Sequence, residues 1–237
     1  MLIKEAKEIV GGLSNCTKMP KFSYGLPAIK CIVGSKLRKV VGSVCAICYA
    51  LTGHYEFEVV QKAQERRLKS LDDPRWMEAM TTLINHYHGP SVPFRWHDSG
   101  DVQSLLHLIM IVTVAKRTPD VQHWLPTKEK AIVKSFLTVF KKFPPNLNVQ
   151  MSGYMVDGPP CNMGEHSDAV THHITYTKSV ANRDTSYTFI KSRQGFRTHK
   201  AYVCPVEVEG SQFESCSKAN CYACWDKSVP VVAGGAH

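Results

Sequence analysis

Between residues 94 and 151 the sequence alternates short strand-like segments with amphipathic helical segments, and this alternation restricts the possible folds more than any other feature. The strand candidates are residues 94–96, 121–125 and 147–151, which begin 26 to 27 residues apart, and the helix candidates between them are residues 104–117 and 129–142. Strands that alternate with helices of this length are joined by parallel βαβ connections. The pattern therefore predicts an α/β fold, built either as a barrel or as an open sheet.

The flanking regions divide the chain further. Apolar spacing predicts a helix from Phe57 and another from Trp76, and residues 170–176 and 187–190 are weaker strand candidates. Residues 1–55 are rich in loops, and the chain becomes irregular and cysteine-rich from Cys204. We therefore expect an α/β unit over residues 1–203 with an N-terminal cysteine loop, followed by a cysteine-rich segment over residues 204–237.

Composition restricts the cellular setting. The chain has 237 residues, 43% apolar and 21% charged, which is typical of a globular protein. It has no apolar run long enough to cross a bilayer, and its start, MLIKEAKEIVGG, lacks the features of an export signal. We expect a cytoplasmic protein, in which nine cysteines indicate metal or cluster ligation better than disulfide bonds.

The strongest chemical motif lies near the C-terminus. Four cysteines follow the pattern C-x11-C-x4-C-x2-C, namely Cys204, Cys216, Cys221 and Cys224. Four thiolates so close in sequence can surround one metal centre without help from distant residues. A single CxxC with irregular partners suits a [4Fe-4S] cluster at least as well as zinc, which prefers two paired CxxC turns.

A second cysteine set lies near the start. Cys31, Cys45 and Cys48 follow the pattern C-x13-C-x2-C, and three ligands leave one coordination position open for a substrate. Cys16 is a candidate fourth ligand, and a single site shared by both CxxC pairs fits the same counts. Cys161 stands alone between Pro160 and Asn162 and is interpreted as a bystander.

Polar residues follow each predicted parallel strand, where ligand sites of α/β proteins lie. His97, Asp98, Ser99, Gly100 and Asp101 follow the first strand. They fit either a ligand site or an ordinary turn, and His97 fits either acid–base chemistry or a structural role. Thr127 and Ser104 are better interpreted as helix caps.

The charge balance allows two interpretations. With 29 Lys and Arg against 20 Asp and Glu, the formal net charge is +9. This excess fits either a solvated surface that also offsets the negative charge of clusters, or nucleic-acid binding. The basic stretch that favours nucleic acid contains Lys191, Arg193, Arg197 and Lys200, with Phe189 and Phe196 interleaved.

The segments SNCTKMPKFSYGLPA, GSVCAICYA, FRWHDSGDVQS and CYACW, together with the terminal His237, resemble the phage "gene product 88" family of uncharacterised proteins. The CxxCYA element and the SGD turn are also similar to radical S-adenosylmethionine enzymes. That similarity implies a partial (β/α) barrel with a [4Fe-4S] cluster on Cys31, Cys45 and Cys48. It also implies that Ser99, Gly100 and Asp101 meet the cofactor's amino group. The sequence departs from that superfamily because it contains no CxxxCxxC.

The leading hypothesis is therefore a phage-type iron–sulfur protein of the host cytoplasm. It would bind one or two [4Fe-4S] clusters and, in an enzymatic form, S-adenosylmethionine held by Asp101 or Asp98. The rival hypotheses are a nonenzymatic zinc- or cluster-braced protein that binds nucleic acid, and an electron-transfer protein. The residues indicate no membrane association and no substrate.

Overall fold

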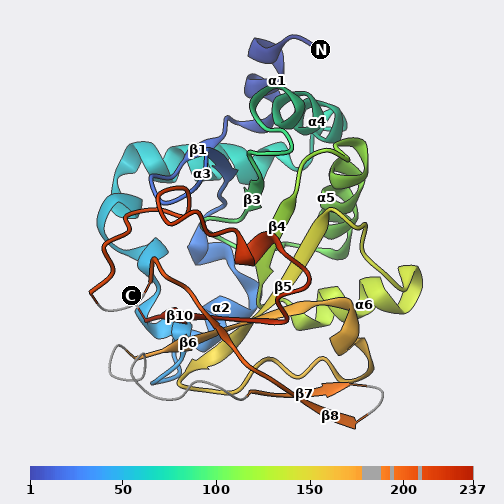
Figure 1. The fold of residues 1–237 in the computed structure, drawn as a ribbon. Coiled ribbons are helices and arrows are strands. Elements are labelled where there is room, and N and C mark those ends of the chain that lie inside the picture. Colours follow the sequence, from blue (N-terminus) through green and yellow to red (C-terminus); the bar gives the residue numbers. More distant parts are fainter. Residues whose placement is uncertain (178–187, 193–194, 208–209, 237) are drawn as a thin grey trace.

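The computed structural model of the protein describes residues 1–177, 188–192, 195–207 and 210–236. Its main element is an eight-stranded sheet in the order β1-β2-β3-β4-β5-β6-β10-β9 (Figure 1). Only the β1–β2 pair is antiparallel, and the remaining pairs are parallel. The strands are β1 (Ser14–Asn15), β2 (Phe22–Tyr24), β3 (Phe94–Trp96), β4 (His123–Thr127), β5 (Leu147–Val156), β6 (Thr171–Tyr176), β9 (Tyr202–Val203) and β10 (Val231–Gly235).

The predicted strand–helix alternation is confirmed. Helix α5 (Leu105–Arg117) separates β3 from β4, and helix α6 (Lys130–Phe140) separates β4 from β5. Ser104 caps α5 as expected, since its hydroxyl accepts a hydrogen bond of 3.0 Å from the His107 backbone N–H. Strand β4 begins two residues later than predicted, and β5 continues to Val156.

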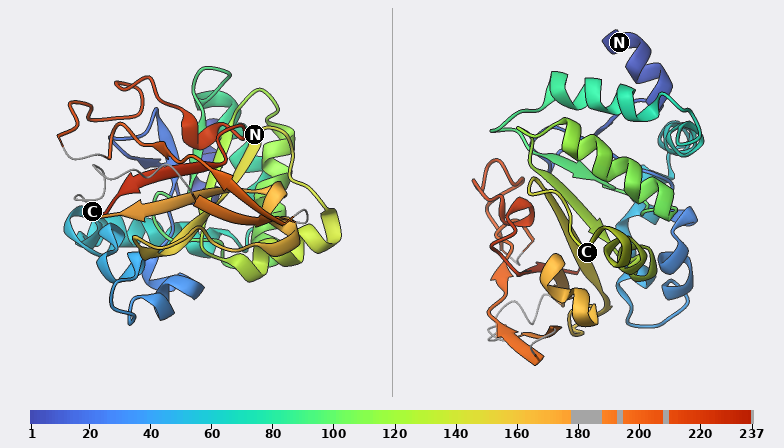
Figure 2. Two further views of the ribbon diagram at one scale, coloured as in Figure 1. Left: turned by 60° about the horizontal axis from the view of Figure 1, so that its bottom comes forward. Right: turned by 90° about the vertical axis from the view of Figure 1, so that its right-hand side faces the viewer.

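The two faces of the sheet differ in chemistry. Phe94, Trp96 and Leu125 are fully buried and belong to the main core with helix α4 (Trp76–Tyr87), α5 and α6. Figure 2 shows these helices on one side of the sheet and the C-terminal segment on the other. The alternate strand residues on that second side are polar or amphipathic, namely Arg95, Trp124, Asn148 and Gln150. We call this second side the polar face.

Helix α3 (Glu58–Ser70), which begins next to the predicted start at Phe57, buries polar side chains. Gln64 and Arg67 are its buried residues. The Arg67 guanidinium donates to the carbonyl oxygens of Gly12 (3.0 Å) and Gly25 (3.2 Å), and the Gln64 amide donates to the Ser99 hydroxyl (3.1 Å). The helix therefore braces loops rather than filling the core, which periodicity of apolar residues cannot reveal.

The expected partial barrel is not observed. The sheet is open, with the short strands β1 and β9 at its two edges. After β5 the chain forms a 3-10 segment (Gly164–Ala169) before β6, and β10 then extends the sheet beside β6. The structure thus shows a mostly parallel α/β sheet, and this topology does not support the likeness to the radical S-adenosylmethionine fold.

The remaining elements lie around this sheet. Helix α1 (Ile3–Val10) packs on α4, and helix α2 (Ile32–Leu37) lies in the N-terminal cysteine loop. Strands β7 (Thr188–Ser192) and β8 (Gly195–His199) form an antiparallel hairpin, which confirms a strand near residues 187–190. Tyr187, Arg193 and His237 lie outside the described residues. No described helix has the length and apolar character that a membrane span requires.

Candidate functional site

The four C-terminal cysteines gather over the polar face of the sheet. Trp225, next to Cys224 in the sequence, packs on Trp124 with ring centroids 5.1 Å apart and donates from its indole nitrogen to the Phe94 carbonyl (2.9 Å). The Asn148 amide donates to the Cys224 carbonyl at 2.8 Å. These contacts fasten the CxxC turn to strands β3, β4 and β5.

The thiols of this group influence one another's ionisation. Burial, together with the charges of Glu207 and Cys216, raises the pKa of Cys204 to about 11. Burial also raises the pKa of Cys224 well above its usual value, with contributions from Cys204 and Cys216. Cys221 completes the group, since its charge raises the pKa of Cys216 and its Sγ lies 3.4 Å from the Tyr202 hydroxyl. The four sequence-predicted ligands therefore form one electrostatically connected group.

The three N-terminal cysteines form a second group. The Sγ atoms of Cys31 and Cys45 each lie 3.6 Å from the position that a Cβ on Gly34 would take, so they are within twice that distance of each other. Burial raises the pKa of the Cys31 thiol, and the charges of Asp101, Cys48 and Cys45 raise it further. The group thus lies close to Asp101, which follows strand β3.

The contacts of Cys16 are with residues of β2 and of the turn after β3. Its Sγ lies 3.5 Å from the Ser23 hydroxyl, and its pKa is raised to about 11 by burial and by the charge of Asp98. Arg95 is the cation that acts on it. The idea of Cys16 as fourth ligand to Cys31, Cys45 and Cys48 therefore gains no support from these contacts.

The turn after β3 is tightly braced within the protein. Asp98 is buried, and its carboxylate accepts hydrogen bonds from the hydroxyls of Ser23 (2.9 Å) and Tyr55 (3.3 Å). The Ser99 hydroxyl donates to the Leu26 carbonyl at 2.8 Å. Gly100 has φ +76°, and a Cβ there would lie 2.7 Å from the Leu26 carbonyl oxygen. These residues hold β2 and β3 together at their carboxyl ends.

Asp101 is the residue of this turn that faces the N-terminal thiols. One carboxylate oxygen accepts from the Thr127 hydroxyl (2.6 Å) and the Val102 N–H (2.7 Å), and the other accepts from the Lys128 N–H (2.9 Å). Burial raises the pKa of Asp101, and these three hydrogen bonds oppose the rise. A ligand at this carboxylate would have to share oxygen atoms that the protein already uses.

His97 is buried at the end of β3, with φ +52°. Its two ring nitrogens have no hydrogen-bond partner, and its ring lies 5.4 Å from that of His107. Burial, together with His107 and Arg95, lowers the pKa of His97 well below its usual value. Both histidine rings are therefore neutral near pH 7, and neither reaches the cysteine groups through a hydrogen bond.

Three further residues lie at these sites although no sequence motif assigned them a role, namely Arg95, Tyr49 and Glu129. The Arg95 guanidinium donates to the Tyr49 hydroxyl (3.2 Å) and stacks 4.6 Å from the centre of the Trp124 ring. Glu129 is buried beside Cys31 and accepts from the Val33 N–H at 2.8 Å. Burial raises the pKa of Glu129 to about 7. The sequence did hold one indication for Arg95, since a charged residue between Phe94 and Trp96 of a short strand suggests a polar contact.

Within the described part of the chain, no three His, Cys, Asp or Glu side chains already lie in an arrangement that could hold a metal ion. The donor chemistry of the two groups still fits a thiolate-bound centre, because each unites three or four half-buried thiols. Binding would have to draw these thiols closer together than they lie here. Such movement accompanies metal binding in proteins whose ligands lie on loops.

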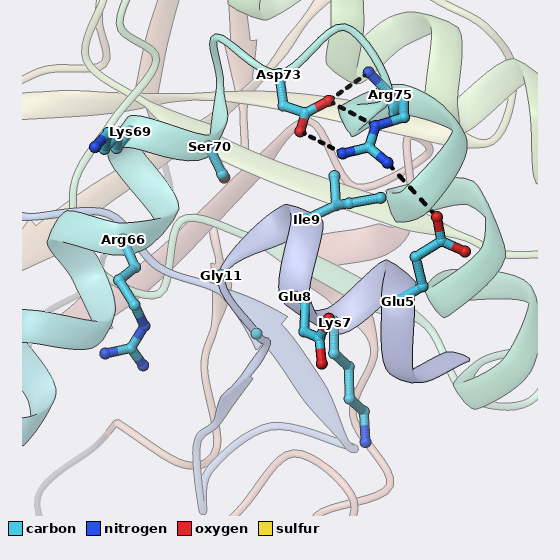
Figure 3. Close-up of a pocket in the computed structure, with 11 residues that line it drawn as sticks. Glu5, Lys7, Glu8, Ile9, Gly11, Arg66, Lys69, Ser70, Asp73 and Arg75 are labelled. Atoms are coloured by element: carbon cyan, nitrogen blue, oxygen red, sulfur yellow. Dashed lines mark hydrogen bonds and ion pairs between the residues drawn. The ribbon is translucent and has the colours of Figure 1, made fainter. Parts of the chain in front are cut away.

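One open cavity of the described structure lies away from both cysteine groups. It has a volume of about 820 Å³ and lies between α1, α3 and the start of α4 (Figure 3). Arg75 is paired there with Asp73 and Glu5, at 3.2 and 3.5 Å. Because cations and anions alternate around this cavity, it shows no preference for a ligand of one charge.

The fold and these contacts define the class as an α/β protein with an open, mostly parallel sheet, one cysteine group near the carboxyl end of β3 and another on its polar face. A family model described as "Gene product 88" matches residues 2–227, so the chain belongs to the gene product 88 family. The resemblance noted from the sequence is thereby confirmed for that family. No curated protein and no solved structure is significantly similar to the chain.

Proposed function

We propose that this member of the gene product 88 family is an iron–sulfur protein that binds a [4Fe-4S] cluster on Cys204, Cys216, Cys221 and Cys224. The observation that carries the proposal is the gathering of these four half-buried cysteines, in which the Cys221 N–H donates to the Cys216 carbonyl at 3.0 Å and the Asn148 amide holds the Cys224 carbonyl. Four thiolates in such a space repel one another, and a cationic cluster core would remove that repulsion. Once bound, the cluster supplies one-electron redox chemistry.

The proposal is tested by anaerobic purification followed by iron, sulfide and zinc analysis and an absorption spectrum. We expect iron and sulfide in equal amounts and the broad visible absorption of thiolate-ligated clusters. Colourless protein with stoichiometric zinc would overturn the cluster proposal and favour a protein stabilised by zinc.

We propose a second [4Fe-4S] site on Cys31, Cys45 and Cys48. The contacts of Cys16 with Ser23 and Asp98 support a set of three ligands, because none of these contacts involves Cys31, Cys45 or Cys48. Three ligands leave one iron open to a substrate. In the enzymatic form of the hypothesis this open position binds S-adenosylmethionine, and Ser99, Gly100 and Asp101 or Asp98 contact its amino group.

The enzymatic form is tested by adding S-adenosylmethionine to the reduced protein and recording its electron paramagnetic resonance spectrum. We expect a perturbed signal that Asp101→Asn weakens. An unchanged spectrum at saturating cofactor, with both clusters present, would exclude this enzyme and leave the electron-transfer role.

The net charge of +9 supports one further candidate, a metal-braced protein that binds nucleic acid. This candidate is tested with duplex DNA at several salt concentrations, since phosphate contacts weaken steeply as salt rises. Absence of DNA binding at low salt would exclude the nucleic-acid-binding candidate.

A further inference from the structure

Arg95 lies on a continuous path of side chains between the two cysteine groups. On one side its guanidinium donates to the hydroxyl of Tyr49, the residue that follows Cys48. On the other side it stacks on Trp124, and Trp124 packs on Trp225, the residue that follows Cys224. The path therefore ends one residue from a cysteine of each group.

The sheet register brings a third thiol to the same cation. Arg95 pairs with Ser23 across strands β2 and β3, and the Ser23 hydroxyl contacts the Sγ of Cys16 and the carboxylate of Asp98. The Arg95 Nη1 also lies 3.6 Å from the Met19 sulfur. The Arg95 guanidinium is thus positioned by the Tyr49 hydroxyl, the Trp124 ring and the Met19 sulfur.

The Arg95 guanidinium lies within electrostatic range of cysteines from both ends of the chain, namely Cys16, Cys216 and Cys224. Burial disfavours the Arg95 cation itself, but Tyr49, Asp98 and Cys16 outweigh that effect and raise its pKa. Arg95 therefore stays positively charged beside the C-terminal group.

We propose that Arg95 is a cation that lies between the two cysteine sites and that it sets the reduction potential of the C-terminal site. The inference rests on the cluster proposed above. An added electron makes a thiolate-bound cluster more negative, and a neighbouring guanidinium stabilises that reduced form. Arg95 is a positioning residue here, because it tunes the cluster from outside its ligand set.

The experiment compares anaerobically purified wild type, Arg95→Gln, Arg95→Lys and Arg75→Gln. Arg75 provides a matched control, since it is an exposed arginine whose partners, Glu5 and Asp73, lie far from the cysteines. Iron content is measured first, and the midpoint potential is then measured by redox titration with electron paramagnetic resonance detection. Loss of a signal in Cys224→Ser identifies it as that of the C-terminal cluster.

We expect Arg95→Gln to lower the equilibrium constant for one-electron reduction about tenfold, which is a shift of about 59 mV to more negative potential. Arg95→Lys keeps the charge and should shift the potential less, and Arg75→Gln should leave it unchanged. If Arg95→Gln binds no iron, Tyr49→Phe gives the second test, because it removes the hydroxyl that orients the guanidinium. It should move the potential in the same direction by a smaller amount.

The possible failures are distinguishable. Wild type without iron overturns the proposed function, and this inference with it. If Arg95→Gln binds iron but its midpoint potential is unchanged, the proposed role of Arg95 is overturned while the cluster proposal stands. If Arg95→Gln binds no iron, an unchanged midpoint potential in Tyr49→Phe overturns that role instead. An equal shift in Arg75→Gln would likewise overturn it, since the effect would then reflect net charge and not position.

Discussion

Single residues at the carboxyl ends of the strands have constraints that come from their neighbours across the loops. Gly100 approaches the Leu26 backbone so closely that any side chain would collide with it. Glu129 is buried beside Cys31 while its carboxylate accepts a hydrogen bond from the Val33 N–H. Gly100 belongs to the SGD turn noted in the sequence, whereas Glu129 belongs to no recognisable motif.

Gly100→Ala should be much more destabilising than Gly53→Ala. Both glycines have positive φ, which costs an alanine about 1–2 kcal/mol, but only at Gly100 does the new Cβ meet backbone atoms. That collision adds roughly 1–3 kcal/mol. Urea unfolding of the two variants measures the difference, and equal losses of stability would contradict the close packing at Leu26.

Glu129→Gln should change how stability depends on pH. Burial raises the carboxyl pKa of Glu129 from 4.5 to about 7, so folding favours its protonated form. The resulting stabilisation is full below pH 4.5 and is lost as the pH rises through 7. It amounts to about 3 kcal/mol.

The measurement is the free energy of unfolding of wild type and Glu129→Gln between pH 4 and 8. We expect the variant, which has no charge to bury, to gain stability relative to wild type as the pH rises. A difference that is independent of pH would show that Glu129 has an ordinary pKa.

At the scale of elements, helices α5 and α3 show two ways in which this chain positions its loops. Helix α5 has a conventional hydroxyl cap at Ser104 and an almost fully apolar buried side. Helix α3 instead buries Gln64 and Arg67, whose side chains hold three loop segments by hydrogen bonds. The first arrangement is visible in sequence periodicity, and the second is not.

Ser104→Ala should destabilise the protein by about 1 kcal/mol, because the His107 N–H loses its acceptor at the start of α5. Ser104→Asp serves as the control, since aspartate supplies an equivalent oxygen and should retain most of the stability. Thermal unfolding monitored by circular dichroism compares the variants. Equal losses for alanine and aspartate would show that the cap contributes little.

At the scale of the whole molecule, one face of the sheet is packed by helices and the other by a cysteine-rich segment with little regular structure (Figure 2). Trp225 and Asn148 join that segment to the sheet. Because the segment has few apolar anchors of its own, a bound cluster would contribute directly to its folding energy.

Cys224→Ser should lose iron from the C-terminal site and lower the stability of the protein, for which Cys161→Ser is the matched control. Cys161 is buried, but its interactions are with Tyr154 and nearby lysines and not with other cysteines. Iron analysis and thermal unfolding of anaerobic samples make the comparison. Iron loss in Cys161→Ser together with iron retention in Cys224→Ser would reverse the ligand assignment.

Local sequence patterns were sufficient to predict the strand–helix alternation, the cap at Ser104 and the two sets of cysteines. These features depend on neighbours within a few residues, so spacing and residue type are sufficient to predict them. The sequence also placed Asp98 and Asp101 at the carboxyl end of a strand. It could not show that Asp101 faces Cys31 or that Asp98 is held by Ser23 and Tyr55.

Only the tertiary structure decided that the sheet stays open, that β10 joins β6 and that Arg95 lies among cysteines from both ends of the chain. Strand order is a matter of contacts between distant segments, which local patterns do not encode. The position of Arg95 depends on register, since moving β3 by one residue would turn its side chain into the apolar core.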